Sequence, residues 1–407
     1  MTWGLLLAGS LVCAAVSAQS PINTEPPAAE VIPATVQPAT VQPGKVQPAE
    51  VQPLAGALEQ IRSQFDLPGL AAGVVSRQGL DESAAVGVRK MGSPTAVTAS
   101  DLWHLGSCTK SLTATLLAVL VQERLLTWET TLAELFPDMA ADMDEDFREI
   151  NVEHLLTHRS GLPANGPWWD LGRERTPTEQ RLELLRRMSA QPLKHAPGSR
   201  YEYSNVGYAL AGLMAETVLQ QTWEVALWER VLKPLKVQSN QIGFGIPGTL
   251  GEVDQPWGHR SSWLGLGPLV AVQLDNAPSL GPAGTMHASL DAWAKFIALH
   301  LDRQQPLLRE ELWDKLHTPP AESEYALGWT VLERSWANGS SEQGRALTHA
   351  GSNTVNYCVC WLAPERGFAV IAVTNSGQVN AAEALNQVSA LLIKRAVARL
   401  ADGSSRQ

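Results

Sequence analysis

The chain has 407 residues, of which 44% are hydrophobic, enough for one large domain or two closely packed domains with a buried core. It carries 31 basic and 41 acidic side chains, which gives a net charge of −10. This acidic balance argues against a nucleic-acid partner, which would select a basic surface, and it says little about a small substrate.

Residues 1–18 have the pattern of a secretory signal peptide. The apolar run 5–16 is too short to span a bilayer comfortably, and it leads into the small-residue sequence Val16-Ser17-Ala18. No basic residue precedes the apolar run, although signal peptides usually have one there. Cys13 makes a lipoprotein the alternative interpretation. We expect an exported protein, periplasmic or secreted, with no transmembrane segment.

Residues 19–53 are rich in proline, alanine and valine. The tripeptide Val-Gln-Pro recurs every five residues, beginning at Val36, Val41, Val46 and Val51. Proline at this density favours extended polyproline II, which cannot bury a core. We interpret the segment as a linker, with a binding tract for a partner as the alternative. One folded domain is expected over 54–400, followed by a short tail over 401–407.

The hydrophobic patterns of the folded part place strands at both ends and helices in the middle. The N-terminal part predicts a helix over 54–65 and strands over 70–76 and 83–88. The centre predicts helices and loops over 107–121 and 126–235, irregular structure over 245–281, and a helix over 289–303. The last part predicts strands over 325–331, 346–349, 356–362 and 368–374, with a hairpin turn at 364–367 and a closing helix over 380–400.

This order of elements predicts the fold class α+β. The simplest architecture is an antiparallel sheet built from the N- and C-terminal segments and flanked by helices, with a mostly helical region inserted between them. A functional site would then lie at the junction of the two regions and draw its residues from distant segments.

The four cysteines do not form a disulfide framework. Cys13 lies in the predicted signal peptide, and Cys358 and Cys360 are two residues apart in one predicted strand, where they cannot easily bridge each other. We therefore expect Cys108, Cys358 and Cys360 to be buried, small apolar thiols.

A serine and a lysine stand at the start of the first central helix. Ser107 follows the turn Leu105-Gly106, and Lys110 comes three residues later on the same helical face. A serine hydroxyl becomes a nucleophile when a base takes its proton, and a lysine whose pKa is lowered by burial can be that base. The free N–H groups of a first helical turn can also face a developing oxyanion. For this pair alone, a solvated helix surface is the alternative.

Two further short motifs carry groups that suit the same chemistry. Tyr203 and Asn205 are two residues apart, so they point the same way in an extended loop. A tyrosine beside a lysine can relay protons, and a side-chain amide can hold a substrate amide. His349 and Gly351 end a predicted strand, where a glycine lets a substrate backbone approach closely. Taken singly, each motif also fits an ordinary structural role.

Two other features have weaker functional interpretations. His154 and His158 are at i, i+4, but the zinc-protease order His-Glu-x-x-His is absent and no third ligand is evident, so no metal is expected. Trp168 and Trp169 lie in a loop rich in proline and glycine. They could line a cleft, with packing at the core or its rim as the alternative.

Taken in order, these motifs resemble the serine β-lactamase/penicillin-binding-protein superfamily, specifically its class C β-lactamase-like and D-Ala-D-Ala carboxypeptidase branch. The three signatures of that branch are Ser-x-x-Lys, Tyr-x-Asn and Lys/His-x-Gly, and here they are residues 107–110, 203–205 and 349–351. Four other phrases are similar to the family: 155–163, 196–198, 281–284, and 364–367 leading to 374–376. The resemblance extends over about 54–400.

The resemblance implies a sheet with an added helical region, and hydrolysis through an acyl-enzyme without a cofactor. Ser107 would attack a carbonyl, while Lys110 and Tyr203 would share the general-base and general-acid roles in either order. Asn205 would bind the acyl amide or orient Lys110. The backbone N–H groups of Ser107 and Ser352 would form the oxyanion hole.

The resemblance also implies that His349, with Gly351 beside it, faces the carboxylate or the leaving group of the substrate. True β-lactamases usually have lysine at this place, and a neutral imidazole anchors a carboxylate less firmly than a permanent cation does. If protonated His349 anchors an anionic substrate, kcat/KM should fall as the pH rises through about 6.5. Residues 352–356 also have less glycine than many relatives, which predicts a narrower or more polar substrate edge.

We therefore expect an exported serine hydrolase that cleaves an ester or amide bond in a small molecule or a short peptide, cell-wall peptides included. Esterase or D-Ala-D-Ala/D-amino peptidase activity is favoured. The alternatives are a true β-lactamase, a catalytically weak module that binds cell-wall peptide, and a metallohydrolase built on His154 and His158.

Overall fold

The computed structural model describes residues 52–262, 267–303, 307–339 and 344–403. The predicted signal peptide 1–18 and most of the predicted linker 19–53 lie outside these residues. Helices and strands run from Leu54 to Ala401, close to the limits expected for the folded domain.

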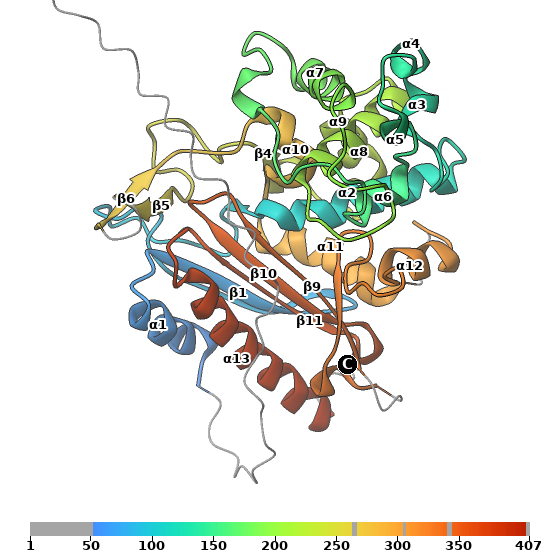
Figure 1. The fold of residues 1–407 in the computed structure, drawn as a ribbon. Helices are drawn as coiled ribbons and strands as arrows, with labels where there is room; N and C mark the ends of the chain where they lie inside the picture. The colour runs from blue at the N-terminus through green and yellow to red at the C-terminus, as the bar shows by residue number, and fades with distance from the viewer. Residues whose placement is uncertain (1–51, 263–266, 304–306, 340–343, 404–407) are drawn as a thin grey trace, which may run out of the picture. The chain divides into compact units, whose positions relative to one another are not determined.

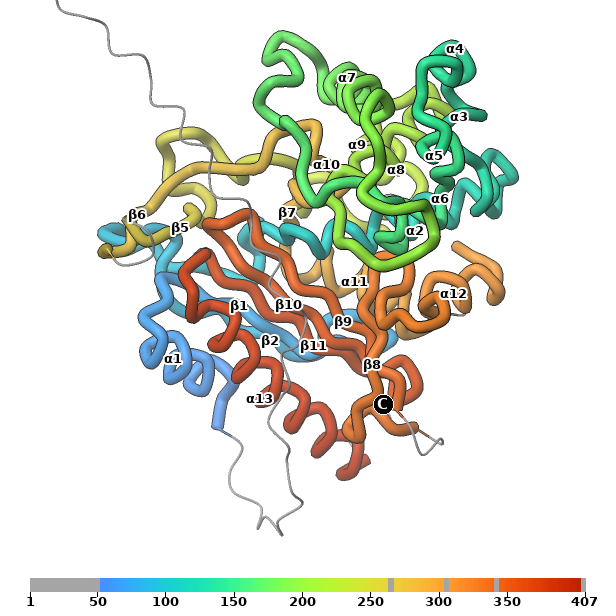
Figure 2. The backbone as a smooth tube through the Cα atoms, viewed as in Figure 1, coloured from blue at the N-terminus to red at the C-terminus, as the bar shows by residue number. Residues whose placement is uncertain are grey.

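A six-stranded antiparallel sheet joins the two ends of the folded region (Figures 1 and 2). The strands lie in the order β2-β1-β11-β10-β9-β8. Within the sheet, Leu70 of β1 stands opposite Thr374 of β11, so N- and C-terminal segments pair directly. Their bounds are β1 (Gly69–Ser76), β2 (Gly79–Gly87), β8 (Thr330–Glu333), β9 (Arg345–Ser352), β10 (Tyr357–Ala363) and β11 (Phe368–Thr374). The predicted architecture is confirmed.

Each face of the sheet is covered by helices because successive side chains of a strand point to opposite faces. On β11, Val370 packs toward the terminal helices α1 (Leu54–Gln64) and α13 (Ala381–Ala401), whereas Ile371 faces the larger core. The long helix α11 (Leu290–Asp302) lies behind the sheet on that second side in Figure 1. The two faces therefore carry two separate apolar cores.

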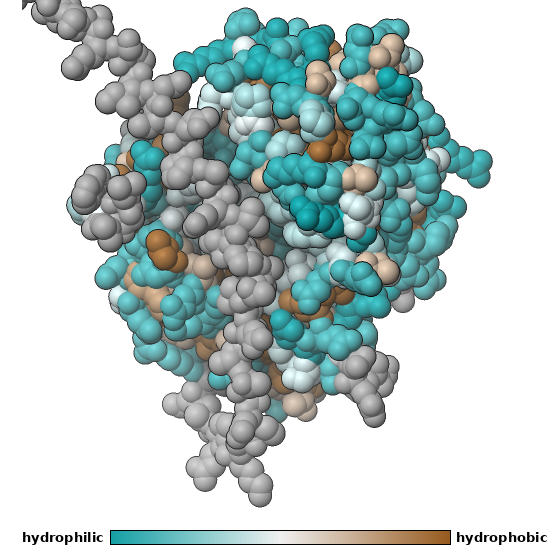
Figure 3. All heavy atoms as spheres, in the orientation of Figure 1, coloured by the Kyte–Doolittle hydropathy of each residue, from teal (hydrophilic) through white to brown (hydrophobic). Residues whose placement is uncertain are grey.

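The helical region lies above the sheet in Figure 1 and is built around α2 (Thr109–Gln122) and α8 (Asn205–Leu219). Both helices are buried along most of their length. Hydrophilic residues cover most of this region in the space-filling view of Figure 3, because the apolar side chains point into the core. The surrounding helices are α3 (Leu132–Leu135), α4 (Pro137–Ala140), α5 (Glu145–Arg148), α6 (Val152–Leu156), α7 (Pro177–Ser189), α9 (Trp223–Leu227), α10 (Gly281–Gly284) and α12 (Glu310–His317).

Three short strands lie at the border between the sheet and the helical region: β3 (Trp103–His104), β7 (Met286–Ala288) and β4 (Ile242–Phe244). A further ribbon pairs β5 (Gly258–Ser261) with β6 (Leu269–Val272), within the segment that was expected to be irregular. These strands have only two to four residues each, too few for a clear alternating pattern. None of the helices in the described ranges is long and apolar enough to cross a membrane.

The strand predicted over 325–331 is wrong in its first half. β8 begins only at Thr330, and the preceding residues form a tight turn in which Ala326 N–H donates to Trp329 O at 2.8 Å. Gly328 has a φ of +81°, and a Cβ there would lie 2.7 Å from Ser111 Cα on α2. A left-handed glycine pressed against a helix breaks the strand that the apolar pattern indicated.

A buried ion pair ties three helices of the helical region together. Arg181 of α7 donates from Nε to Glu216 Oε2 at 3.1 Å and from Nη2 to Oε1 at 2.8 Å, and both side chains are almost fully buried. The same Glu216 carboxylate accepts from the backbone N–H of Trp223, at the start of α9, at 2.9 Å. Glu224 lies farther from Arg181, at 3.4 Å, and is partly exposed.

Removal of one partner should therefore leave a buried, uncompensated guanidinium. We expect Glu216→Ala to lower the free energy of unfolding by about 3–5 kcal/mol, measured by urea denaturation. The matched control Glu224→Ala, which removes the partly exposed partner, should cost about 1 kcal/mol or less. Equal losses in the two variants would contradict this account.

Candidate active site

Ser107 lies in a tight turn that links β3 to α2. A 3-10 turn, Gly106–Cys108, precedes the first residue of α2, so the serine stands at a helix N-terminus as predicted. Gly106 has a φ of +45°, and a Cβ there would lie 2.4 Å from the amide nitrogen of Ser352. Only glycine fits this position. The turn thus holds the partly exposed Ser107 against the end of β9.

The Lys110 amine lies beneath Ser107 and is fully buried. Its Nζ lies 3.0 Å from Ser107 Oγ, 2.8 Å from Asn205 Oδ1 and 2.8 Å from Ala283 O. None of the described carboxylates is among these partners. Burial therefore lowers the pKa of the Lys110 amine well below its usual value. A neutral amine has two N–H groups for the two carbonyl oxygens and one lone pair for the Ser107 hydroxyl, which matches these three contacts.

The Tyr203 hydroxyl is the second group on the nucleophile, because Tyr203 Oη donates to Ser107 Oγ at 2.8 Å. Burial raises the pKa of the Tyr203 phenol, so it keeps its proton at neutral pH. The phenol ring packs against the His158 imidazole, with 4.3 Å between ring centroids. The two groups beside Ser107 thus have opposite properties: a weakly basic amine and a weakly acidic phenol.

Asn205 begins α8 and reaches the lysine rather than standing free. Its Oδ1 accepts from Lys110, and its Nδ2 donates to Asn165 Oδ1 at 2.9 Å. Ser204 caps the helix by accepting from Gly207 N–H, which fixes the N-terminus of α8 next to the site. Of the two roles expected for Asn205, this geometry matches the orientation of Lys110.

His349 lies in β9 with both ring nitrogens engaged inside the protein. Burial, with a smaller contribution from Lys110, lowers the pKa of His349 to about 3. The ring is therefore neutral near pH 7, with Nδ1 2.7 Å from Ala350 O and Nε2 3.0 Å from the Tyr325 hydroxyl. A desolvated imidazole with two neutral partners does not favour the predicted anchoring of a carboxylate by protonated His349 near pH 6.5, and that role stays a prediction.

Gly351 serves the packing of the protein itself. A Cβ at this position would lie 2.1 Å from Leu105 O and 2.8 Å from the amide nitrogen of Ser107. Gly351 thus lets the nucleophile turn approach β9 closely, and its expected contact with a substrate backbone stays a prediction. Ser352 follows directly, and its amide nitrogen lies beside Gly106, so the two predicted oxyanion donors belong to segments in contact.

The polar segment after β9 turns its side chains inward. Asn353 Oδ1 accepts from the N–H and Nδ2 of Asn356, each at 3.0 Å, and both residues are buried. Ser352 Oγ donates to Asn356 O at 2.9 Å. In this segment, which has less glycine than many relatives, these hydrogen bonds hold a fixed turn. The two buried asparagines therefore do not line an open polar edge.

The two weaker features have structural positions. His154 caps α6 together with Asn151, and His158 Nδ1 accepts from Ser204 N–H at 3.0 Å. In the part of the chain that the structure describes, no three His, Cys, Asp or Glu side chains are placed to hold a metal ion. Trp168 packs against the core while Trp169 is 49% exposed, and both line a cavity of about 370 Å³ that none of the motif residues reaches.

The three described cysteines are buried and free, as predicted. Cys108 and Cys358 place their sulfurs 3.4 Å apart, directly behind the nucleophile turn. Burial raises the pKa of the Cys108 thiol, which keeps it protonated and unreactive. These thiols act as small core residues.

Three contacting groups were not predicted from the sequence: Asn165 on Asn205, Ala283 O on Lys110, and the Tyr325 hydroxyl on His349. Ala283 lies in a phrase shared with the family, but a backbone carbonyl has no sequence signal of its own. Asn165 and Tyr325 come from loops whose position depends on the tertiary fold. No spacing rule would have found them.

A mixed sheet-and-helix fold with a serine, a buried lysine and a tyrosine in contact defines a serine hydrolase of the β-lactamase and penicillin-binding type. Residues 54–393 match the family model described as Beta-lactamase, and the chain belongs to that family.

Individual relatives are distant. The chain is 26% identical over 337 residues to penicillin-binding protein 4 of Amycolatopsis lactamdurans, covering 78% of this chain and 84% of that protein. It is 25% identical over 344 residues to the unguisins hydrolase ungD' of Aspergillus campestris, covering 79% of this chain and only 61% of that protein. The D-amino acid amidase of Ochrobactrum anthropi SV3, solved with L-phenylalanine, superposes with a TM-score of 0.67 at 19% identity, covering 84% and 98% of the two chains.

The buried imidazole gives a direct test of the site geometry. We expect no titration of His349 between pH 4.5 and 8 by NMR, because its pKa of about 3 lies below that range. The positively charged, protonated ring should appear only as the pH falls toward 3. The signal can be assigned with His349→Gln, and the same chain unfolded in urea should titrate near 6.5. A folded-state midpoint above 5.5 would contradict the geometry.

Proposed function

We propose that this chain is an exported serine hydrolase that cleaves an ester or amide bond through an acyl-enzyme on Ser107. The observation that carries the proposal is the double contact on one oxygen: Ser107 Oγ lies 3.0 Å from the buried Lys110 amine and 2.8 Å from the Tyr203 hydroxyl. A serine that touches both a low-pKa amine and a high-pKa phenol has a proton acceptor and a proton donor in place. Export rests on the sequence pattern of residues 1–18.

The pKa directions support an order for the proton transfers. The neutral Lys110 amine takes the Ser107 proton as Oγ bonds to the substrate carbonyl carbon. The carbonyl oxygen gains negative charge and is stabilised by the amides of Ser107 and Ser352, a contribution of about 3 kcal/mol per donor. When the bond to the leaving group breaks, Tyr203 gives that group a proton and recovers one from Lys110. Tyr203 is assigned the acid role because burial keeps its phenol protonated.

The second half of the reaction reuses the same groups. A water molecule gives its proton to the neutral Lys110 amine and attacks the acyl carbon. The acyl–Oγ bond then breaks, and the proton returns from Lys110 to Ser107. Asn205 and Ala283 hold the amine through both halves, because each accepts one of its N–H groups. The chain's own residues thus complete one hydrolytic cycle.

The neutral state of His349 supports esters and amides that do not depend on a carboxylate anchor. Both ring nitrogens are engaged, and the ring carries no charge near pH 7. This disfavours β-lactams and substrates recognised mainly by a terminal carboxylate. The likeness to a D-amino acid amidase supports amide substrates that include D-amino acids.

Ser107→Ala tests the nucleophile. We expect a fluorophosphonate probe to label the wild type and not this variant, and turnover of short acyl esters to fall by about 10³-fold or more. Ser111→Ala removes a buried hydroxyl one turn further along α2 and should retain labelling. Full labelling of Ser107→Ala would contradict the assignment. Parallel assays with nitrocefin, D-amino acid amides and D-Ala-D-Ala peptides rank the substrate classes, and nitrocefin as the best substrate would favour the β-lactamase alternative.

Lys110 should set the acidic limb of the pH profile. The general base must be neutral, so kcat/KM should rise with pH as Lys110 loses its proton, and then level off well below the ordinary lysine pKa of about 10.4. Lys110→Arg keeps the positive charge but cannot release it, so we expect a loss of about 10²-fold or more from pH 6 to 9. The control Lys295→Arg changes a partly exposed lysine on α11. A Lys110→Arg rate above a tenth of the wild-type rate would exclude Lys110 as the base.

A further inference from the structure

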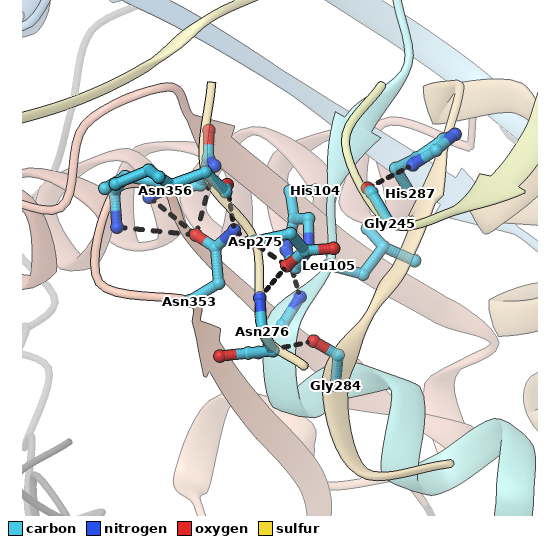
Figure 4. Close-up of polar contacts among 12 residues, drawn as sticks. His104, Leu105, Gly245, Asp275, Asn276, Gly284, His287, Asn353 and Asn356 are labelled. Atoms are coloured by element: carbon cyan, nitrogen blue, oxygen red, sulfur yellow. Dashed lines mark hydrogen bonds and ion pairs between the residues drawn. The ribbon is translucent and has the colours of Figure 1, made fainter. Parts of the chain in front are cut away.

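Asp275 is a buried carboxylate that the reaction scheme above does not use. Its side chain is 4% exposed and lies in the loop that precedes α10. Figure 4 shows it among polar groups from several segments. Asp275 Oδ1 accepts from Asn276 N–H at 2.7 Å and from Asn353 Nδ2 at 3.2 Å, and it lies 2.7 Å from His104 Nε2. One oxygen atom thus joins β3, the loop at 275 and the turn after β9.

The first arm of this cluster leads to the nucleophile turn. The backbone N–H of Gly106 donates to His104 Nδ1 at 3.0 Å. Nδ1 accepts this bond and so carries no proton, while Nε2 faces Asp275. Gly106 has a left-handed backbone and immediately precedes Ser107. The orientation of the peptide between them fixes the direction of the Ser107 N–H.

The second arm leads to the other expected oxyanion donor. Asn353 follows Ser352, and its amide is held on both sides: Nδ2 by Asp275, and Oδ1 by the N–H of Asn356 at 3.0 Å. The next residue, Thr354, has a φ of +73°, so this turn is held in a conformation that a threonine rarely adopts. A displaced Asn353 would therefore displace Ser352 with it.

A third contact reaches the lysine through the neighbouring residue. Asn276 Nδ2 donates to Gly284 O at 2.8 Å, and the carbonyl of the preceding residue, Ala283, accepts from Lys110. The loop at 275–276 thus contacts β3, the turn after β9 and the 281–284 turn.

We propose that Asp275 is the positioning residue of the oxyanion site, holding the Ser107 and Ser352 amides in register through His104 and Asn353. This inference rests on the proposed function, because it assumes acylation of Ser107. Asp275 Oδ1 accepts from Asn353 Nδ2 and lies at ion-pair distance from His104 Nε2, so one carboxylate oxygen contacts both arms. Donors that stabilise an oxyanion must be aligned within a few tenths of an ångström, so a carboxylate that fixes both segments would preserve that alignment.

The test compares Asp275→Ala with Asp275→Asn. The measured quantity is the oxygen preference, the ratio of turnover of an ester to turnover of the matched thionoester, in which sulfur replaces the carbonyl oxygen. An aligned oxyanion site is built for oxygen, and the larger, weakly accepting sulfur of a thionoester fits it poorly. The ratio of turnover of a matched ester and thionoester is independent of the amount of folded enzyme. We expect Asp275→Ala to lower kcat on the ester by about 10²-fold with KM within about threefold, and to lower the oxygen preference at least tenfold.

Asp275→Asn retains an acceptor oxygen at the position of Oδ1, so it should keep the oxygen preference within about threefold of the wild type. Asp254→Ala is the control, because that carboxylate accepts from the Thr249 N–H in a different loop, between β4 and β5. It should leave kcat and the preference unchanged.

An unchanged oxygen preference in Asp275→Ala, with lost activity that follows the titrated amount of folded enzyme, would overturn the proposal and leave Asp275 with a purely structural role. If Asp275→Ala fails to fold, Asn353→Ala cuts only the second arm and should still lower the preference at least threefold. A wild-type ratio in that variant would overturn the proposal equally. A failure of the proposed function itself is distinguishable, because Ser107→Ala would then retain full turnover of the ester.

Discussion

Burial of the Lys110 amine away from any described carboxylate is the constraint on which the site depends. An ammonium group in this position would lose its hydration without gaining a counterion, so the neutral form is favoured. The two carbonyl oxygens that receive its N–H groups come from the start of α8 and from the 281–284 turn. The low pKa of Lys110 therefore depends on how the helical region packs against α2. Ser204 caps α8 and Arg181 pairs with Glu216 of the same helix, so both hold the helix that carries Asn205.

A second constraint is the short distance between the nucleophile turn and β9. Gly106 and Gly351 face each other's backbone, and a Cβ on either would meet main-chain atoms of the opposite segment at 2.1–2.4 Å. Main chain in contact with main chain is stiffer than contact through side chains, because no rotamer change can relieve a displacement. The expected oxyanion donors, the amides of Ser107 and Ser352, thus belong to rigid backbone. The two segments can move relative to each other only as far as the contacts at their outer ends allow.

Much of this could be predicted from the sequence. The sheet, its terminal helices and α11 follow from apolar periodicity, and Ser107, Lys110, Tyr203 and Asn205 follow from short motifs whose spacing has a physical meaning. The short strands β4 to β6 could not be predicted, because three or four residues do not establish a period. The turn at Gly328 could not be predicted either, because its contact with a helix about 200 residues away in the sequence leaves no local signal.

His349 shows the same limit. Its residue type was visible, whereas its burial and its two partners, which remove its charge, depend on tertiary packing. Asp275 belongs to no motif at all, since its contacts arise only where β3, its own loop and the turn after β9 meet.

The pairing of β1 with β11 has a consequence for the synthesis of the protein. The strand β1 leaves the ribosome early, yet one of its two neighbours in the sheet, β11, is translated only near the end of the folded region. Contacts between such distant segments are slow to form because a long loop must close first. The end of β9 that supports Ser107 is likewise absent until late in translation. A nascent chain would therefore carry its serine unassembled, and the reactive centre would arise only when the C-terminal strands complete the sheet.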